Sequence, residues 1–124
     1  DEQFKEFNYS EKEMIKMPGI GSYTSAAIRS IVFSQPSSAI DGNFIRVFSR
    51  LIGIKISEQI NLKNIQETVK NICDSIIQDN RPGDFNQAVM DIANLLCFPK
   101  AKPKCHICPL SRYCKAFSNS GRDI

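Results

Sequence analysis

Residues 17–43, MPGIGSYTSAAIRSIVFSQPSSAIDGN, decide how the rest of the chain is interpreted. The stretch opens with a glycine turn, PGIG at residues 18–21, and continues into an apolar segment with helical spacing. A Pro/Ser break at residues 36–38 follows, and a single carboxylate, Asp41, stands beside the next glycine. The pattern predicts a backbone turn that can hold a phosphate, one helix away from an acid, and this arrangement suits chemistry on a nucleic acid.

The composition is that of one globular domain with a modest core. The chain has 124 residues, a hydrophobic fraction of 42% and a charged fraction of 23%, which are ordinary values for a folded domain. Its sequence contains no apolar run long enough to span a membrane and no recognisable signal peptide. We therefore expect a protein without a membrane partner.

Helical periodicity dominates, and no strand pair is convincing, so we expect an all-α fold. Ser10 and Glu13 form a capping box ahead of a short helix over about residues 10–16. A second helix follows the glycine turn, and Ser22 is expected to cap it. Two helices joined by a Gly-x-Gly turn indicate a helix-hairpin-helix.

Three further amphipathic helices are expected. The first begins beside Asp41 and ends at Gly53, and the segment 54–62 after it is ambiguous. A clear helical stripe runs over residues 65–77. Asp84 is expected to cap the last helix, which leads to a cysteine-rich loop and a polar tail.

Four of the five cysteines follow the spacing Cys97-x7-Cys105-x2-Cys108-x5-Cys114. An odd cysteine count without a secretory signal favours metal ligation over disulfides. A four-cysteine zinc site and a [4Fe–4S] cluster both remain open, and the wide spacing with a single C-x-x-C fits the cluster better. Four free core cysteines are disfavoured, because the surroundings are charged and Pro-rich. Cys73 lies on an apolar stripe, and we expect it to be a buried hydrophobic residue.

The same loop is basic. Residues 97–115 contain no acidic residue and five basic ones, namely Lys100, Lys102, Lys104, Arg112 and Lys115. Such a patch is typical of a phosphate-binding surface, although a solvated loop explains the charge equally well. His106 is interpreted as solvated or phosphate-facing rather than as a ligand, because four thiolates already suffice.

The hairpin, the Asp after a Pro break and the four-cysteine loop together resemble the endonuclease III superfamily of DNA glycosylases. DGN at residues 41–43 with RV at 46–47, and FNQA at 85–88 with MD at 90–91, resemble its adenine-specific branch, the MutY family. The match runs from about Ser10 to Lys115. One departure is an extra residue between Cys97 and Cys105, since the family loop is C-x6-C-x2-C-x5-C.

The resemblance implies a helix-hairpin-helix glycosylase fold in two parts. Residues 1–53 would form part of a six-helix domain that carries the hairpin and Asp41. Residues 54–124 would form the C-terminal helices and an iron–sulfur loop with Cys97, Cys105, Cys108 and Cys114 as [4Fe–4S] ligands.

It also implies roles for the residues around Asp41. Asp41 would stabilise the sugar cation that forms when the glycosidic bond breaks, although from sequence alone a helix cap is favoured, and one Asp can serve both roles. Tyr23 and Asn43 would set this carboxylate. Their structural alternatives are a core-edge aromatic and a turn or cap residue. Tyr23 stands where the lyase branch carries its Schiff-base lysine, which implies a monofunctional enzyme.

The DNA contacts implied by the family come from two places. The hairpin would hold the DNA backbone, in many members with a bound monovalent cation, through Gly19, Ile20, Gly21 and Ser22. A purely structural helix–helix turn is the alternative for the hairpin. The cysteine loop would add contacts from Lys102, Lys104 and Arg112.

The expected function is base-excision repair: removal of adenine opposite 8-oxoguanine or guanine from double-stranded DNA. The partner is then DNA inside the cell, in the nucleus of a eukaryote or the cytoplasm and nucleoid of a bacterium, and a monomer is expected. The family's general-acid glutamate and its 8-oxoguanine-reading domain have no counterpart in the sequence, so the chain is expected to be an inactive fragment. The alternatives are another glycosylase of the superfamily and a non-catalytic four-cysteine DNA-binding module.

Overall fold

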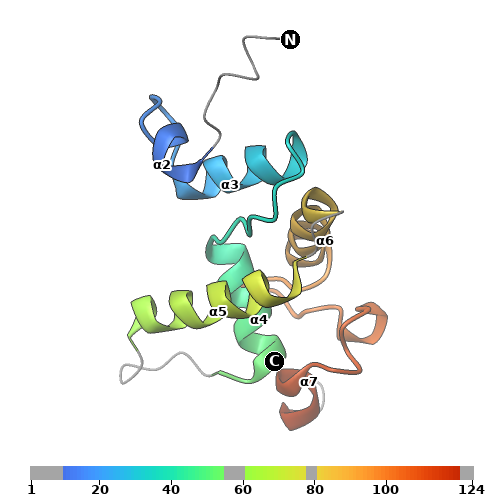
Figure 1. Cartoon of the computed structure of the whole chain (residues 1–124). Coiled ribbons are helices and arrows are strands. Elements are labelled where there is room, and N and C mark those ends of the chain that lie inside the picture. Colours follow the sequence, from blue (N-terminus) through green and yellow to red (C-terminus); the bar gives the residue numbers. More distant parts are fainter. Residues whose placement is uncertain (1–9, 55–60, 78–80, 121–124) are drawn as a thin grey trace.

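The computed structural model describes residues 10–54, 61–77 and 81–120, and every regular element in these ranges is helical (Figure 1). This confirms the all-α prediction. The ambiguous segment 54–62 lies mostly outside the described residues. The elements are α2 (Glu11–Met14), α3 (Ser22–Ile31), α4 (Gly42–Ile52), α5 (Leu62–Ile76), α6 (Pro82–Leu95), the short 3-10 helix η1 (Cys105–Ile107) and α7 (Lys115–Ser120).

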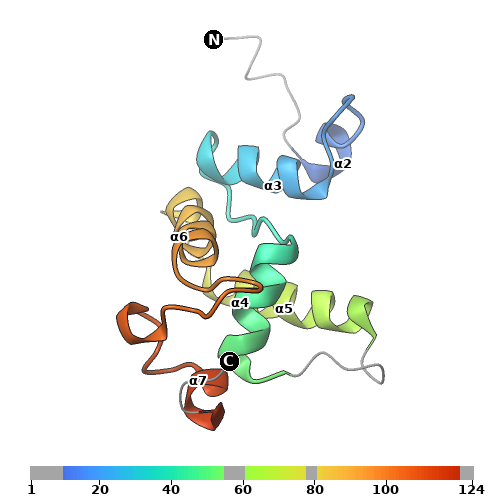
Figure 2. The same cartoon turned by 180° about the vertical axis from the view of Figure 1, so that it is seen from behind.

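Helix α4 lies at the centre of the molecule, where it contacts α5, α6 and α7. The hairpin helices α2 and α3 lie beyond one end of α4, and α3 packs on α6. The cysteine loop and α7 lie toward the other end, and Figure 2 shows the orange segment after α6 reaching α4 and then turning away from it. The hairpin and the cysteine loop are therefore at opposite ends of one central helix.

The sequence around α4 explains its bounds and its burial. Asp41 is the N-cap and accepts a hydrogen bond from the Phe44 N–H at 3.0 Å, and Gly53 ends the helix with φ 82°. Phe44 is fully buried, and its ring centroid lies 6.2 Å from that of Phe48 and 6.3 Å from that of Phe85. Burying one such side chain stabilises the fold by about 2–3 kcal/mol. Both expected ends of this helix are confirmed.

Two expected helix caps are wrong. Ser22 is the first residue of α3, and Gly21 occupies the N-cap without a side-chain bond. The Ser22 hydroxyl instead donates to Glu11 on α2. Asp84 lies inside the first turn of α6, because Pro82 starts that helix one turn earlier and Arg81 precedes it. Proline suits the first helical position, where its missing N–H costs nothing.

The first hairpin helix is shorter than expected. It spans Glu11–Met14 rather than residues 10–16, and the Ser10 hydroxyl caps it by accepting from the Glu13 N–H at 3.3 Å. The chain then turns through Gly19, whose φ of 80° is readily adopted only by glycine. Across the described ranges, no helix is both long enough and apolar enough to cross a membrane.

Candidate active site and four-cysteine cavity

The carboxylate of Asp41 is held from two directions. One oxygen accepts from the Phe44 N–H at 3.0 Å, and the other accepts from the Asn43 side-chain amide at 3.3 Å. Asp41 itself is half-buried. A carboxylate at a helix N-terminus is also stabilised by the helix dipole. Asp41 therefore serves as a helix cap, and its half-exposed position leaves it accessible to a ligand.

Tyr23, on α3, lies near Asp41. Its hydroxyl donates to the Met90 sulfur on α6 at 3.2 Å. Burial, and after it the negative charge of Asp41, raise the pKa of the Tyr23 phenol. Residues from α3, α4 and α6 that are far apart in sequence therefore meet around Asp41.

Arg46 connects this region to the cysteine loop. Its guanidinium donates to the Asn43 side-chain oxygen at 3.1 Å, to the Ala93 carbonyl at 2.8 Å and to the Cys97 carbonyl at 2.9 Å. A planar guanidinium with five N–H donors can make three such hydrogen bonds to separate acceptors, whereas an ammonium cannot. The residue beside Asp41 and the first cysteine of the loop thus share one partner.

The hairpin turn leaves its two glycines open to solvent. Gly19 and Gly21 are exposed, and a Cβ added at either would meet no atom within 4 Å. The Ile20 N–H donates to the Met17 carbonyl at 3.2 Å, so this amide already has a partner inside the turn. The first N–H groups of a helix lack intrahelical acceptors. Those of Ser22 and Tyr23, at the start of α3, are consequently better placed than that of Ile20 to bind an anion.

The four loop cysteines line one small cavity of about 30 Å³, with apolar neighbours that include Leu51, Leu110 and Phe117. Burial first, and then the neighbouring cysteines, raise the pKa of the Cys105 thiol. Among the described residues, no group of three or more His, Cys, Asp or Glu side chains has the geometry to hold one metal ion. The four thiols thus border a common space without converging on a single point.

The residue types that line this cavity are compatible with the predicted cluster. Its donor set is four thiols, and no carboxylate lines it. Arg50 lies at its edge and donates to the Cys97 sulfur at 3.1 Å and to the Phe98 carbonyl at 2.8 Å. Such N–H···S bonds stabilise thiolate ligands. His106 does not line the cavity and instead lies edge-on to Phe117, with centroids 5.8 Å apart.

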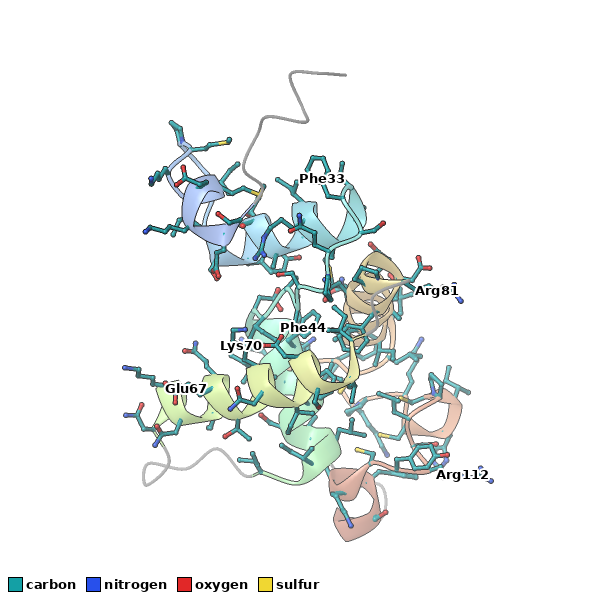
Figure 3. The ribbon with its side chains drawn as sticks, viewed as in Figure 1. Phe33, Phe44, Glu67, Lys70, Arg81 and Arg112 are labelled. Carbon is teal, nitrogen blue, oxygen red and sulfur yellow. The ribbon has the colours of Figure 1, made fainter. Side chains whose placement is uncertain are left out.

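The loop cations point to solvent. Lys102, Lys104 and Arg112 are all exposed, and Figure 3 shows Arg112 projecting outward from the cysteine loop. The Lys104 ammonium lies 5.8 Å from the centroid of the Phe98 ring, so its stem follows the loop before the charge reaches water. Cys73 is fully buried in the core, as expected.

Solved structures share this helical arrangement, although no protein-family model matches the chain. A thermostable thymine-DNA glycosylase superposes with a TM-score of 0.76 at 28% identity, over 91% of this chain and 50% of that chain. Endonuclease III in a non-covalent DNA complex superposes with a TM-score of 0.67 at 23% identity, over 99% of this chain and 54% of that one. The chain therefore has the helix-hairpin-helix fold of the DNA glycosylases, as predicted.

Within that class, the sequence is similar to the adenine DNA glycosylases, and this resemblance is confirmed. The chain is 38% identical over 101 residues to the adenine DNA glycosylase of Schizosaccharomyces pombe, which covers 82% of this chain and 21% of the relative. It is also 30% identical over 108 residues to the thymine/uracil-DNA glycosylase of Methanothermobacter thermautotrophicus, covering 87% of this chain and 47% of the relative. The chain thus spans less than half the length of these two curated relatives.

Sequence reasoning missed the contributions of Arg50, Met90 and Asn86 to this site. No role was predicted for Arg50, and its bonds to the cysteine loop join residues 47 and 48 positions apart in the sequence. Met90 and Asn86 were considered only as parts of the FNQA and MD motifs. In the structure, Met90 accepts a hydrogen bond from Tyr23 and Asn86 accepts one from Ala39, both near Asp41. The one available signal was Asn86 itself, a polar residue on the helix face that it shares with the apolar Val89 and Ala93.

Proposed function

We propose that this chain is part of the catalytic domain of a base-excision-repair DNA glycosylase, a hydrolase that removes adenine paired with 8-oxoguanine or guanine. The observation that carries the proposal is the Asp41 carboxylate, fixed by Phe44 and Asn43 and flanked by Tyr23. The similarity to adenine DNA glycosylases supports the choice of base. Double-stranded DNA is then the partner, inside the cell, and the protein acts as a monomer.

Asp41 acts on the sugar in this proposal. As the N-glycosidic bond breaks, its electron pair leaves with the base, and positive charge develops at the anomeric carbon. The fixed carboxylate stabilises that charge or traps it covalently, and water then completes the hydrolysis. Asn43 orients the carboxylate through its side-chain amide, and Tyr23 lies close enough on α3 for the Asp41 charge to raise the pKa of its phenol.

Tyr23 also makes the reaction monofunctional. A strand-cleaving lyase requires an amine that forms a Schiff base with the sugar. A phenol at this position, with its pKa raised by burial and by Asp41, offers no such nucleophile. Departure of adenine also requires a general acid that protonates the base.

The remaining surfaces bind DNA and shape the domain. Residues 1–53 contribute the hairpin, whose exposed turn and α3 N-terminus bind a backbone phosphate, with a monovalent cation beside it. Residues 54–124 contribute the cysteine loop, whose exposed cations bind the backbone further along. Cys97, Cys105, Cys108 and Cys114 would hold a [4Fe–4S] cluster, which crosslinks this loop and takes no part in base removal.

The test is the identity of the released base. The experiment uses the restored protein, which is this chain extended by the N-terminal portion of the catalytic domain, with duplexes that contain A:8-oxoguanine, A:G or T:G. Free adenine from the first two, without strand cleavage, is expected. Release of thymine from T:G alone would overturn the adenine assignment and favour the second candidate, a thymine-mismatch glycosylase, which the 30% identical thymine/uracil relative supports.

A further inference from the structure

Asn86, on α6, is fully buried and uses its whole carboxamide in hydrogen bonds. Its Oδ1 accepts from the Ala39 N–H at 3.1 Å, and its Nδ2 donates to the Ser37 carbonyl and to the Ser30 hydroxyl, both at 2.8 Å. Both amide hydrogens therefore have acceptors. One side chain joins α6 to α3 and to the segment that leads into Asp41.

Two of these three bonds hold the backbone just before Asp41. Ala39 is fully buried and lies two residues before Asp41, and the Ser37 carbonyl that accepts from Asn86 lies on the other side of Ser38. On its far side, Asp41 is tied to α4 by the Phe44 N–H and through its own carbonyl, which accepts from the Ile45 N–H at 3.0 Å. The carboxylate thus has one anchor upstream, supplied by Asn86, and one downstream, supplied by α4.

Tyr23, the tyrosine beside Asp41, lies on the side of α3 that contacts α6. Asn86 and Met90 are one turn apart on α6, and Ser30 and Tyr23 are two turns apart on α3. The Asn86–Ser30 bond and the Tyr23–Met90 bond therefore join the two helices along one seam. If Asn86 moved, the segment that leads into Asp41 would shift relative to these two inter-helix bonds. The position of Asp41 relative to Tyr23 would then change.

From these contacts we propose that Asn86 is a positioning residue: its carboxamide holds residues 37–39 so that the Asp41 carboxylate stands correctly beside Tyr23. The inference rests on the proposed function, because it assigns the residue that sets the geometry of the proposed catalytic group. Asn86 acts through Asp41 and contacts no reacting atom. Positioning matters because a misplacement of about 1 Å lowers an enzymatic rate by roughly 100-fold.

The test compares Asn86→Ala with Ser30→Ala in the restored protein. Ser30→Ala is the matched control, because it removes a partner of the same amide in the α3–α6 seam but keeps both bonds to residues 37–39. We expect Asn86→Ala to lower the single-turnover rate of adenine release by about 10- to 100-fold, with unchanged affinity for the duplex. Ser30→Ala is expected to keep the parent rate.

Amide hydrogen exchange gives a readout that does not need activity. The Phe44 N–H reports its bond to the Asp41 carboxylate, and the Ala39 N–H reports its bond to Asn86. Both amides should exchange faster in Asn86→Ala than in Ser30→Ala. Asn86→Asp keeps the size of the side chain and the acceptor for Ala39, and it replaces Asn86→Ala if that variant does not fold. It should also speed exchange at Phe44 while keeping more of the protection at Ala39.

Two results would overturn the positioning role. One is an equal loss of rate in Asn86→Ala and Ser30→Ala, which would indicate packing alone. The other is unchanged exchange at Phe44 in the Asn86 variants that fold. If the unsubstituted restored protein releases no adenine, the proposed function fails, and the exchange at Phe44 still decides whether Asn86 positions Asp41.

Discussion

The guanidinium of Arg46 donates to the backbone carbonyl of Cys97, 2.9 Å away, although the two residues are 51 positions apart in the sequence. The same guanidinium bonds to Asn43, the residue that also contacts the Asp41 carboxylate. The loop that would carry the cluster is therefore built onto the helix that carries the candidate catalytic acid. Folding of one should stabilise the other.

Replacement of Arg46 by Ala should lower the free energy of unfolding by about 2–4 kcal/mol, because the carbonyls of Ala93 and Cys97 lose a charged donor. Arg46→Lys should recover little of this, since an ammonium cannot span the three acceptors. Urea unfolding of the restored protein measures both. The exposed Arg112→Ala is the control, expected within about 0.5 kcal/mol of the parent. Equal stabilities of Arg46→Ala and Arg112→Ala would contradict the anchoring role.

At Gly83 the backbone of α6 lies close to that of α3. A Cβ at this position would lie 2.9 Å from the Ile31 Cα and 3.0 Å from the Ser30 carbonyl oxygen, and both are backbone atoms that cannot move alone. Gly83→Ala should therefore destabilise the protein by about 1–3 kcal/mol. Gly42→Ala, in the first turn of α4 with open space around it, should be neutral or stabilising by up to about 1 kcal/mol. Thermal unfolding compares the two, and a Gly83→Ala variant as stable as Gly42→Ala would refute the close packing.

The four loop cysteines should behave as one set and Cys73 should not. We expect about four iron atoms per chain in the restored protein. A Ser substitution at Cys97, Cys105, Cys108 or Cys114 should reduce iron content and visible absorbance together. Cys73→Ser should keep the iron, because Cys73 lies in the helical core away from the cavity. Zinc in place of iron, or iron that survives loss of Cys105, would contradict the cluster.

Burial gives Cys73 a pH signature. It raises the pKa of this thiol from 9.0 to about 12 in the folded protein. Between these values the unfolded chain loses the Cys73 proton while the folded chain keeps it, so the thiol lowers the free energy of unfolding as the pH rises from 9 to about 12. Below pH 9 it has no such effect. The difference in unfolding free energy between parent and Cys73→Ala, followed over this range, should shrink with pH, and a constant difference would contradict the shift.

Helix ends that depend on residues only a few positions away were predicted correctly in several cases. The caps of Ser10 and Asp41 and the stop at Gly53 each depend on side chains or φ values next to the helix end, so the sequence contains them. The failures at Ser22 and Asp84 have a physical cause. In each case another local feature, the Glu11 partner of Ser22 or the early start at Pro82, competed with the expected cap.

The candidate site was only partly predictable. Asp41, Tyr23 and the loop cysteines stand out because their residue types and spacing carry chemistry. Asn86, Arg46 and Arg50 act through partners 47 or more positions away, and no periodicity within one helix encodes such a contact. Their roles emerge only once α3, α4 and α6 are packed together.

The central claim, that Asp41 performs base removal, is tested most directly by single-turnover adenine release from an A:8-oxoguanine duplex. The restored protein is compared with its Asp41→Asn variant, which keeps the size of the side chain and an oxygen that can accept from Phe44, and duplex affinity is measured on both. We predict release by the parent, loss of release in Asp41→Asn and retained binding. Equal release by the two proteins, or tight binding without release by either, would contradict the account.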